Sequence, residues 1–222
     1  MDAFGFQQDA ATKIADRFAD YAANPLMVDR QTTVPFLQTL VSITGSGKTL
    51  ILADTIAQIR DRLPIQPIVL WISKGKIVVS QAYANLSSGK YADNLPGFTV
   101  KPLLQLAPSD LEDSAVPLLL VATVGKFAVE DSDGGDRKVF QAQLDLASDS
   151  LWTLLAKRRS SAGIRRPLIV VYDEGHNLSD LQTRRLLELS PDALISASAT
   201  MALPSRLDST ITRLKTDRGW QD

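Results

Sequence analysis

The chain has 222 residues, of which 45% are hydrophobic, enough apolar sequence for one sizeable globular core. Its 24 lysines and arginines nearly balance its 25 aspartates and glutamates, so no bulk positive charge indicates a nucleic-acid or membrane partner. The lack of cysteine excludes disulfides, thiol nucleophiles and thiolate metal sites, and a single histidine argues against a zinc site.

The first ten residues, "MDAFGFQQDA", lack the basic and apolar regions of a secretory signal. The longest apolar run, "VPLLLVATV" at 116–124, is too short to span a bilayer. We therefore expect no membrane partner and a cytoplasmic location, which the lack of cysteine also suits.

Apolar residues recur at helical spacing between Phe6 and Tyr21, which predicts an amphipathic helix that ends at Asn24 and Pro25. Six short runs rich in Val, Ile and Leu follow, mostly separated by stretches of helical pattern. These runs are "VPFLQTLVSI" (34–43), "PIVLWIS" (67–73), "FTVKPLLQL" (98–106), "PLLLVATV" (117–124), "PLIVVYD" (167–173) and "ALISASA" (193–199). Continuous apolar runs indicate strands buried on both faces, so we expect an α/β fold, with a mostly parallel sheet and helices on both faces. Ligands of such sheets bind beyond the carboxyl ends of the strands.

Residues 130–166 interrupt this alternation with charged residues, a Gly-Gly turn and one helical stretch at 151–156. We interpret the segment as an insertion before the fifth strand. Within it, the basic stretch "KRRSSAGIRR" at 157–166 is interpreted as a solvated loop, with contact to DNA as the alternative.

The segment "SITGSGKTL" at 42–50 follows the first predicted strand. Phosphate binding needs inward-pointing backbone N–H groups, glycines that permit a tight path, and a helix start whose dipole favours anions. Gly45, Gly47 and a helix beginning near Lys48 would supply all three. Lys48 would then reach the β and γ phosphates of a nucleotide, and the Thr49 hydroxyl would bind Mg²⁺. The alternative is an ordinary strand-to-helix turn.

Asp173 and Glu174 stand at the carboxyl end of the fifth predicted strand. An aspartate there can hold Mg²⁺ opposite Thr49 through the ion's water shell, while the neighbouring glutamate orients or deprotonates the attacking water. The alternative is that both carboxylates cap the helix predicted in "LSDLQTRRLLEL" at 178–189.

The last predicted strand ends in "SASAT" at 196–200. Ser198 and Thr200 could hydrogen-bond a group on an adjacent strand end, and His176 is the candidate partner. The alternative is a strand terminus made of small residues beside an incidental histidine.

Read in order, "TGSGKT" (44–49), "DEGH" (173–176) and "SAT" (198–200) resemble motifs I, II and III of superfamily 2 helicases and translocases, the DEAD/DEAH-box class. "FQQDA" at 6–10 is similar to the stretch by which many of these proteins recognise adenine. "VVYDEGHNLSD" and "VATVGKFA" look most like the restriction-type branch, which includes the motor subunits of type III restriction enzymes. The resemblance covers essentially the whole chain, 1–222, as one RecA-like P-loop NTPase domain.

This resemblance implies one site for ATP and Mg²⁺. Gln7 would recognise adenine, with Phe4 or Phe6 as a stacking surface. Nucleotide binding is implied for Gln7, Thr44, Gly45, Ser46, Gly47, Lys48 and Thr49. Catalytic roles are implied for Lys48, Asp173, Glu174 and His176, with Thr49 and Asp173 as the residues that hold Mg²⁺.

His176 in this family would link the nucleotide site to the rest of the motor through Ser198 or Thr200, rather than bind metal or act as a general base. Two positions depart from the patterns. Ser42 replaces the first glycine of the strict P-loop, and Gly175 stands where the DEAH pattern has alanine. Neither change removes a functional group from the site.

The expected partner is nucleic acid, DNA rather than RNA. In relatives, the segments after the second and fourth strands lie along the phosphate backbone. The matching candidates here are Ser73, Lys74, Lys76, Thr123 and Lys126, and the alternative is that they are solvated turn residues.

Superfamily 2 motors hydrolyse ATP between two RecA-like domains, and the second domain supplies an arginine finger. Residues 201–222 are too few to form that domain, so we expect this chain to need the second RecA-like domain of the same full-length protein. The expected function is that of the ATP-binding N-terminal motor domain of an ATP-dependent DNA helicase or translocase. The alternatives are a P-loop ATPase that remodels proteins and a noncatalytic nucleotide-binding interaction module.

Overall fold

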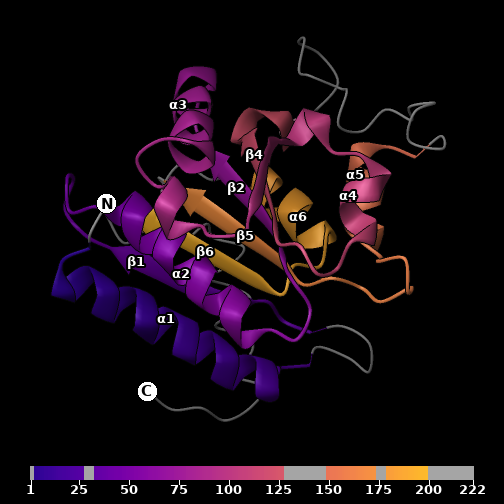
Figure 1. Cartoon of the computed structure of the whole chain (residues 1–222), viewed down its shortest axis with the longest axis horizontal. Coiled ribbons are helices and arrows are strands. Elements are labelled where there is room, and N and C mark those ends of the chain that lie inside the picture. Colours follow the sequence, from indigo (N-terminus) through magenta and orange to yellow (C-terminus); the bar gives the residue numbers. More distant parts are fainter. Residues whose placement is uncertain (1–2, 28–32, 128–148, 174–178, 200–222) are drawn as a thin grey trace.

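The structure, a computed structural model, describes residues 3–27, 33–127, 149–173 and 179–199. Within these ranges six strands form one sheet in the order β1-β6-β5-β2-β4-β3, and every neighbouring pair is parallel (Figure 1). The strands are β1 (Phe36–Val41), β2 (Ile68–Ser73), β3 (Thr99–Pro102), β4 (Leu118–Thr123), β5 (Leu168–Asp173) and β6 (Ala193–Ser198). Each lies within one of the six apolar runs, so the prediction of a RecA-like α/β sheet is confirmed.

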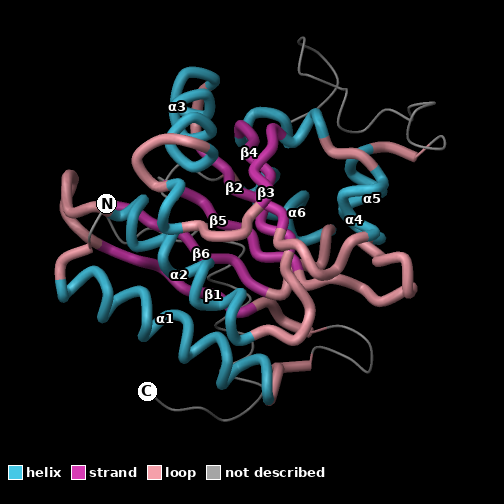
Figure 2. The backbone as a smooth tube through the Cα atoms, in the orientation of Figure 1, coloured by secondary structure: helices cyan, strands magenta, loops and turns pink. Residues whose placement is uncertain are grey.

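Helices cover both faces of the sheet (Figures 1 and 2). The α-helices are α1 (Gly5–Ala23), α2 (Lys48–Arg62), α3 (Lys76–Ser87), α4 (Pro108–Glu112), α5 (Leu151–Lys157) and α6 (Asp180–Glu188). Three short 3-10 turns, η1 (Ala92–Asn94), η2 (Leu103–Gln105) and η3 (Val124–Phe127), complete the connections. Among these helices none has the length and apolar character needed to cross a membrane.

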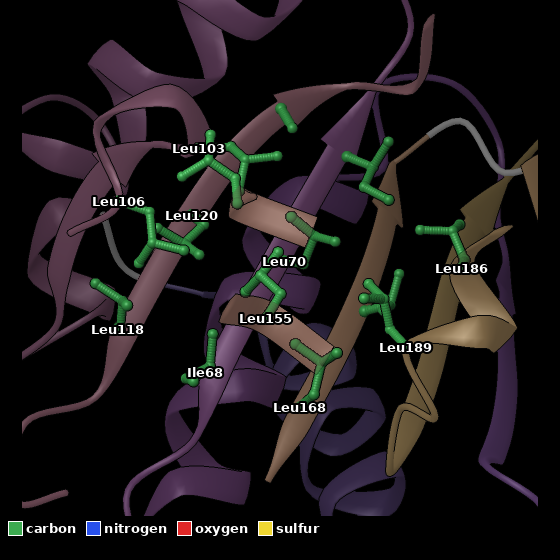
Figure 3. Packing of buried hydrophobic residues seen from close by; sticks show 14 of the residues in the cluster. Ile68, Leu70, Leu103, Leu106, Leu118, Leu120, Leu155, Leu168, Leu186 and Leu189 are labelled. Atoms are coloured by element: carbon green, nitrogen blue, oxygen red, sulfur yellow. The ribbon is translucent and has the colours of Figure 1, made fainter. Parts of the chain in front are cut away.

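Alternate residues of the central strands enter two different cores. Trp71 and Val171 pack with the buried residues of α1 and α2 on one face. Leu70, Val170 and Tyr172 pack on the other face with leucines of α5 and α6, part of which Figure 3 shows. Because both faces are buried, β2, β4 and β5 need apolar side chains at every position, which explains their continuous apolar runs.

The amphipathic helix that was predicted to begin near Phe6 and to end at Asn24 is confirmed as α1. Its Ala11, Ile14 and Phe18 are buried, Ile14 and Phe18 share a core with residues of α2, and Phe18 meets Phe36 of β1 edge to face at a ring-centroid distance of 5.7 Å. An ion pair of 2.6 Å joins Asp16 of α1 to Arg62 of α2. These contacts hold α1 against α2 and β1.

The order of the strands determines which loops meet. Strand β1 is an edge strand, and β6 lies between β1 and β5, so that Ala197 is in register with Leu40 on one side and Asp173 on the other. All six strands point the same way, so the carboxyl ends of β1, β5, β2 and β4 lie at one edge of the sheet.

The prediction that the basic stretch at 157–166 is a solvated loop is wrong for two of its arginines. Arg158 and Arg166 are both 0% exposed. The Arg158 guanidinium donates to the carbonyls of Arg166 and Leu189, each at 2.8 Å, and to that of Ser190 at 2.7 Å. The Arg166 guanidinium donates to further carbonyls, those of Gln66, Pro67, Asp110, Leu111, Asp113 and Val116. A buried guanidinium needs such acceptors, so these two arginines anchor a short hairpin to the domain.

Candidate functional site

The loop between β1 and α2 has the geometry that anion binding requires. Gly45 and Gly47 adopt left-handed backbone angles, with φ of 84° and 82°, a region that side-chain-bearing residues enter at a cost. Gly47 is the N-cap of α2, whose first helical residue is Lys48. The backbone N–H groups of this first turn have no acceptor within the helix, and they lie at the positive end of its dipole.

Lys48 is buried within this loop, at 8% exposure. Its Nζ donates to the carbonyl oxygens of Ser42 and Ile43, each at 3.0 Å. A buried ammonium must find acceptors, and here the loop's own backbone supplies them. The side chain therefore already points into the loop, where phosphate oxygens could replace the two carbonyls.

Thr49 and Asp173 meet across 124 positions of sequence. The Thr49 hydroxyl donates to Asp173 Oδ2 at 2.8 Å. The strands that carry these segments are not neighbours, and the small Ala197 of β6 lies between them in register. The pair brings together a hydroxyl and a carboxylate oxygen, the hard oxygen ligands that Mg²⁺ prefers.

The capping alternative for Asp173 is wrong. Helix α6 begins at Asp180, and Ser179 is its N-cap. Ser179 Oγ accepts the Gln182 N–H at 3.3 Å, while Gln182 Oε1 accepts the Ser179 N–H at 2.9 Å. This capping box satisfies the helix start several residues after Asp173, whose carboxylate accepts the Thr49 hydroxyl instead.

Gln7 is joined to the same loop. Its side chain is 5% exposed, with Nε2 donating to the Ser46 carbonyl at 2.8 Å and Oε1 accepting the Phe4 N–H at 2.9 Å. The rings of Phe4 and Phe6 stack with an interplanar angle of 6° and remain largely exposed. The amide group that the sequence singles out thus lies against the loop, beside two exposed aromatic rings.

Ser42 shows why the first glycine of the strict pattern is dispensable here. Gly45 and Gly47 have positive φ, whereas Ser42 does not adopt this left-handed conformation. Its N–H donates to the Ser198 carbonyl at 3.1 Å, which extends the pairing of β1 with β6 by one step. The link between the loop and the buried Ser198 is made by backbone atoms, so no residue type in the sequence signalled it.

The candidate nucleic-acid residues fall at the same edge of the sheet. Ser73 and Thr123 are register partners at the ends of β2 and β4, and Lys74 is exposed. Ser73 is only 1% exposed, so its hydroxyl faces the protein interior. Lys76 begins α3, and Lys126 lies in η3.

Four of the predicted positions, Glu174, Gly175, His176 and Thr200, lie outside the described residues. The same is true of residues 128–148, most of the predicted insertion. Its remainder contains α5 and the arginine-anchored hairpin.

The fold and this edge define an α/β domain of the RecA-like type with a P-loop-like strand-to-helix turn. Comparison with protein families matches residues 2–203 to the family described as type III restriction enzyme, res subunit. The match spans most of the chain, so the chain belongs to this family, one of superfamily 2 helicase N-terminal domains. Membership places it among helicase-like, ATP-dependent motor domains. No protein among the curated ones matches the chain.

Proposed function

We propose that this chain is the Mg-ATP-binding motor domain of a DNA helicase or translocase. The observation that carries the proposal is the 2.8 Å contact between the Thr49 hydroxyl and the Asp173 carboxylate. An ordinary strand-to-helix turn does not require a hydroxyl in the first helical turn to contact a carboxylate from a strand that is not adjacent to the preceding strand.

The loop residues would bind the phosphates. Backbone N–H groups from Gly45 to Thr49 would donate to phosphate oxygens, with the α2 dipole behind them. Lys48 would exchange the Ser42 and Ile43 carbonyls for β and γ phosphate oxygens. The exchange keeps the ammonium paired throughout, so it avoids the cost of a buried unpaired charge.

Thr49 and Asp173 would hold Mg²⁺, the threonine directly and the aspartate through water. Both groups supply oxygen atoms and already lie within hydrogen-bond distance, so they fit this ion. When bound, Mg²⁺ would neutralise charge that develops on the phosphates. Glu174 would orient the attacking water.

Gln7 would read the adenine edge with its amide, next to the stacking surface of Phe4 and Phe6. The hydrogen bond from Gln7 to the Ser46 carbonyl supports this placement, because it puts the amide beside the phosphate loop. Base and phosphates of one nucleotide would then contact the same short stretch of protein.

His176 would couple hydrolysis to movement through Ser198 or Thr200. The backbone bond from Ser42 to Ser198 supports a connection between the phosphate loop and the end of β6. Lys74, Lys76, Thr123 and Lys126 are proposed to follow the DNA backbone, whereas the burial of Ser73 removes its hydroxyl from this set. A second RecA-like domain would supply the arginine finger, which is worth on the order of 10³ to 10⁵ in rate.

The first test is a titration of a fluorescent ATP analogue with Mg²⁺. The unsubstituted chain should bind saturably, Lys48→Ala should weaken binding at least about tenfold, and Glu174→Gln should retain it. Turnover by this chain alone should be slow and little changed by DNA. Failure of the folded chain to bind, or binding that Lys48→Ala leaves intact, would contradict the proposed site. Fast DNA-stimulated turnover without a second domain would contradict the proposed need for one.

A further inference from the structure

The hairpin at 158–166 lies at the opposite edge of the sheet from the phosphate loop. It directly precedes β5, so it stands at the amino ends of the strands, whereas the loop stands at their carboxyl ends. In Figure 1 it is the orange segment that leads into β5, far from the turn between β1 and α2. The proposed motor function assigns it no role.

The hairpin divides its four arginines into two pairs. Arg158 and Arg166 are buried anchors, as described above, while Arg159 and Arg165 are exposed. An antiparallel bridge places Arg159 directly opposite Arg165. The N–H groups of Ser160 and Arg166 donate to the carbonyls of Ile164 and Arg158, each at 2.9 Å, and this pattern makes Arg159 and Arg165 a non-hydrogen-bonded pair.

Such a pair brings two cationic side chains close together on one face. Cα atoms in non-hydrogen-bonded antiparallel pairs lie about 4.5 Å apart, the closer of the two kinds of pair. Like charges in directly opposite positions are destabilising. In the described part of the chain, no carboxylate lies within ion-pair distance of either guanidinium.

Each exposed arginine retains most of its donors. Arg159 uses one Nη on the Gly163 carbonyl and Arg165 uses one Nη on the Ser190 carbonyl, both at 2.7 Å. A guanidinium has five N–H donors, so the pair can still grip a carboxylate or phosphate from both sides. Burial is the main cause that lowers the pKa of Arg158 to about 10; the charge of Arg165 lowers it further, while Asp192 opposes the shift.

An acidic turn next to the hairpin favours a carboxylate-bearing peptide over a nucleic-acid backbone as the bound anion. The tip of the hairpin rests on an acidic turn, with the Ser161 N–H bonded to the Glu112 carbonyl at 3.1 Å and Arg166 bonded to that of Asp113. Glu112 and Asp113 are exposed. A continuous polyanion such as a nucleic-acid backbone would meet this acidic turn and be repelled, whereas a polypeptide can present carboxylates to the arginine pair alone.

We propose that Arg159 and Arg165 form a docking site for a carboxylate-bearing segment of a protein partner, on the edge of the domain away from the nucleotide. The buried anchors hold the backbone of this hairpin in place, so the arginine pair is organised before the partner arrives. The site leaves the carboxyl edge of the sheet free for ATP and DNA.

Binding of a short fluorescein-labelled peptide with one pair of glutamates among serines and glycines, followed by fluorescence polarisation at low salt, tests the site. The double variant Arg159→Glu with Arg165→Glu should lose about tenfold or more in affinity, equivalent to about 1.4 kcal/mol. Lys13→Glu with Arg17→Glu on α1 carries the same charge change on exposed residues elsewhere and should lose little. Equal losses in both double variants, or no peptide binding by the folded unsubstituted chain, would overturn the proposal.

Three further measurements separate this role from others. Arg159→Glu alone turns the like-charged pair into an ion pair, so its thermal midpoint should match or exceed that of the unsubstituted chain while peptide affinity falls. A fall in both the thermal midpoint and the peptide affinity would indicate a structural role and count against docking. A single-stranded oligonucleotide that binds tighter than the peptide, and loses that affinity in the hairpin variant alone, would assign the pair to nucleic acid instead. ATP binding by the hairpin variants, which should be unchanged, distinguishes this outcome from failure of the motor site.

Discussion

Thr49 and Asp173 form a hydrogen bond of 2.8 Å that joins the first turn of α2 to the carboxyl end of β5. This bond ties the first turn of α2 to the segment with the proposed catalytic carboxylates. It also gives the Mg²⁺ assignment its sharpest test.

Removal of the Thr49 hydroxyl should remove most of the Mg²⁺ dependence of nucleotide binding. We expect Thr49→Val to weaken Mg-nucleotide binding about tenfold, because one oxygen ligand is lost, and to leave binding in EDTA unchanged. Thr49→Ser keeps the hydroxyl and should behave like the unsubstituted chain. Titrations of the fluorescent nucleotide with and without Mg²⁺ measure this, and a full Mg²⁺ dependence in Thr49→Val would show that the ion binds elsewhere.

Gly47 and Gly45 provide a matched pair that isolates the role of Gln7. Both have φ above 80°, so alanine at either position should cost about 1 kcal/mol of unfolding free energy through backbone strain alone. A Cβ at Gly47 would also lie 2.3 Å from Gln7 Nε2, whereas nothing lies within 4 Å of one at Gly45. Gly47→Ala should therefore displace the Gln7 amide and cost a further 1 kcal/mol or so in urea unfolding.

The double variant Gly47→Ala with Gln7→Ala checks the cause. Without the amide there is no clash, so the two substitutions should cost less together than the sum of their separate costs. Strict additivity would mean that the loop relaxes without disturbing Gln7.

Gln7 should determine the preference for adenine. Its amide offers both a donor and an acceptor to a base edge, so Gln7→Ala should reduce the preference for ATP over GTP by about tenfold. The neighbouring Gln8 is exposed and makes a matched control, since Gln8→Ala should preserve the preference. Competition of each nucleotide against the fluorescent analogue gives the two affinities, and an unchanged ratio in Gln7→Ala would remove the residue from base recognition.

Arg158 should matter far more for stability than its neighbour Arg159. Arg158→Met leaves the carbonyls of Leu189 and Ser190 without this donor and should cost about 3 kcal/mol or more in urea unfolding. Arg159→Met removes an exposed side chain and should change stability by less than about 0.5 kcal/mol. Similar costs at both positions would mean that the buried hydrogen bonds contribute little.

Asp54 of α2 should destabilise the folded chain at neutral pH and do so less as the pH falls. Desolvation by burial raises its pKa, against the smaller lowering effect of the hydrogen bond from Gln58. The folded state then binds a proton more readily than the unfolded state, so the charged form costs stability above this pKa and the cost fades as pH falls through it. Asp54→Asn should therefore stabilise the chain at pH 7, with a gain that shrinks towards pH 3. Unfolding curves across this range measure it, and a gain that grows at low pH would reverse the assignment.

Local patterns in the sequence were sufficient for much of this protein. The six strands were predictable because burial on both faces demands apolar residues at every position of a strand. The tight turn between β1 and α2 was predictable because its backbone path needs Gly45 and Gly47 and a helix follows at once, and its binding of phosphate stays a proposal. The position of Asp173 at the same edge as the loop after β1 was predictable because carboxyl ends of parallel strands share one edge.

Only the tertiary structure decided which atoms meet. The strand order places β6 between β1 and β5 and brings Thr49 to Asp173, while the packing of α1 on α2 brings Gln7 to the Ser46 carbonyl. Arg158 and Arg166 were expected in solvent, but their partners are backbone carbonyls contributed by distant segments. Every residue carries a carbonyl, so such acceptors leave no mark in the sequence, and only the packed chain shows which arginines they hold inside and which two remain outside.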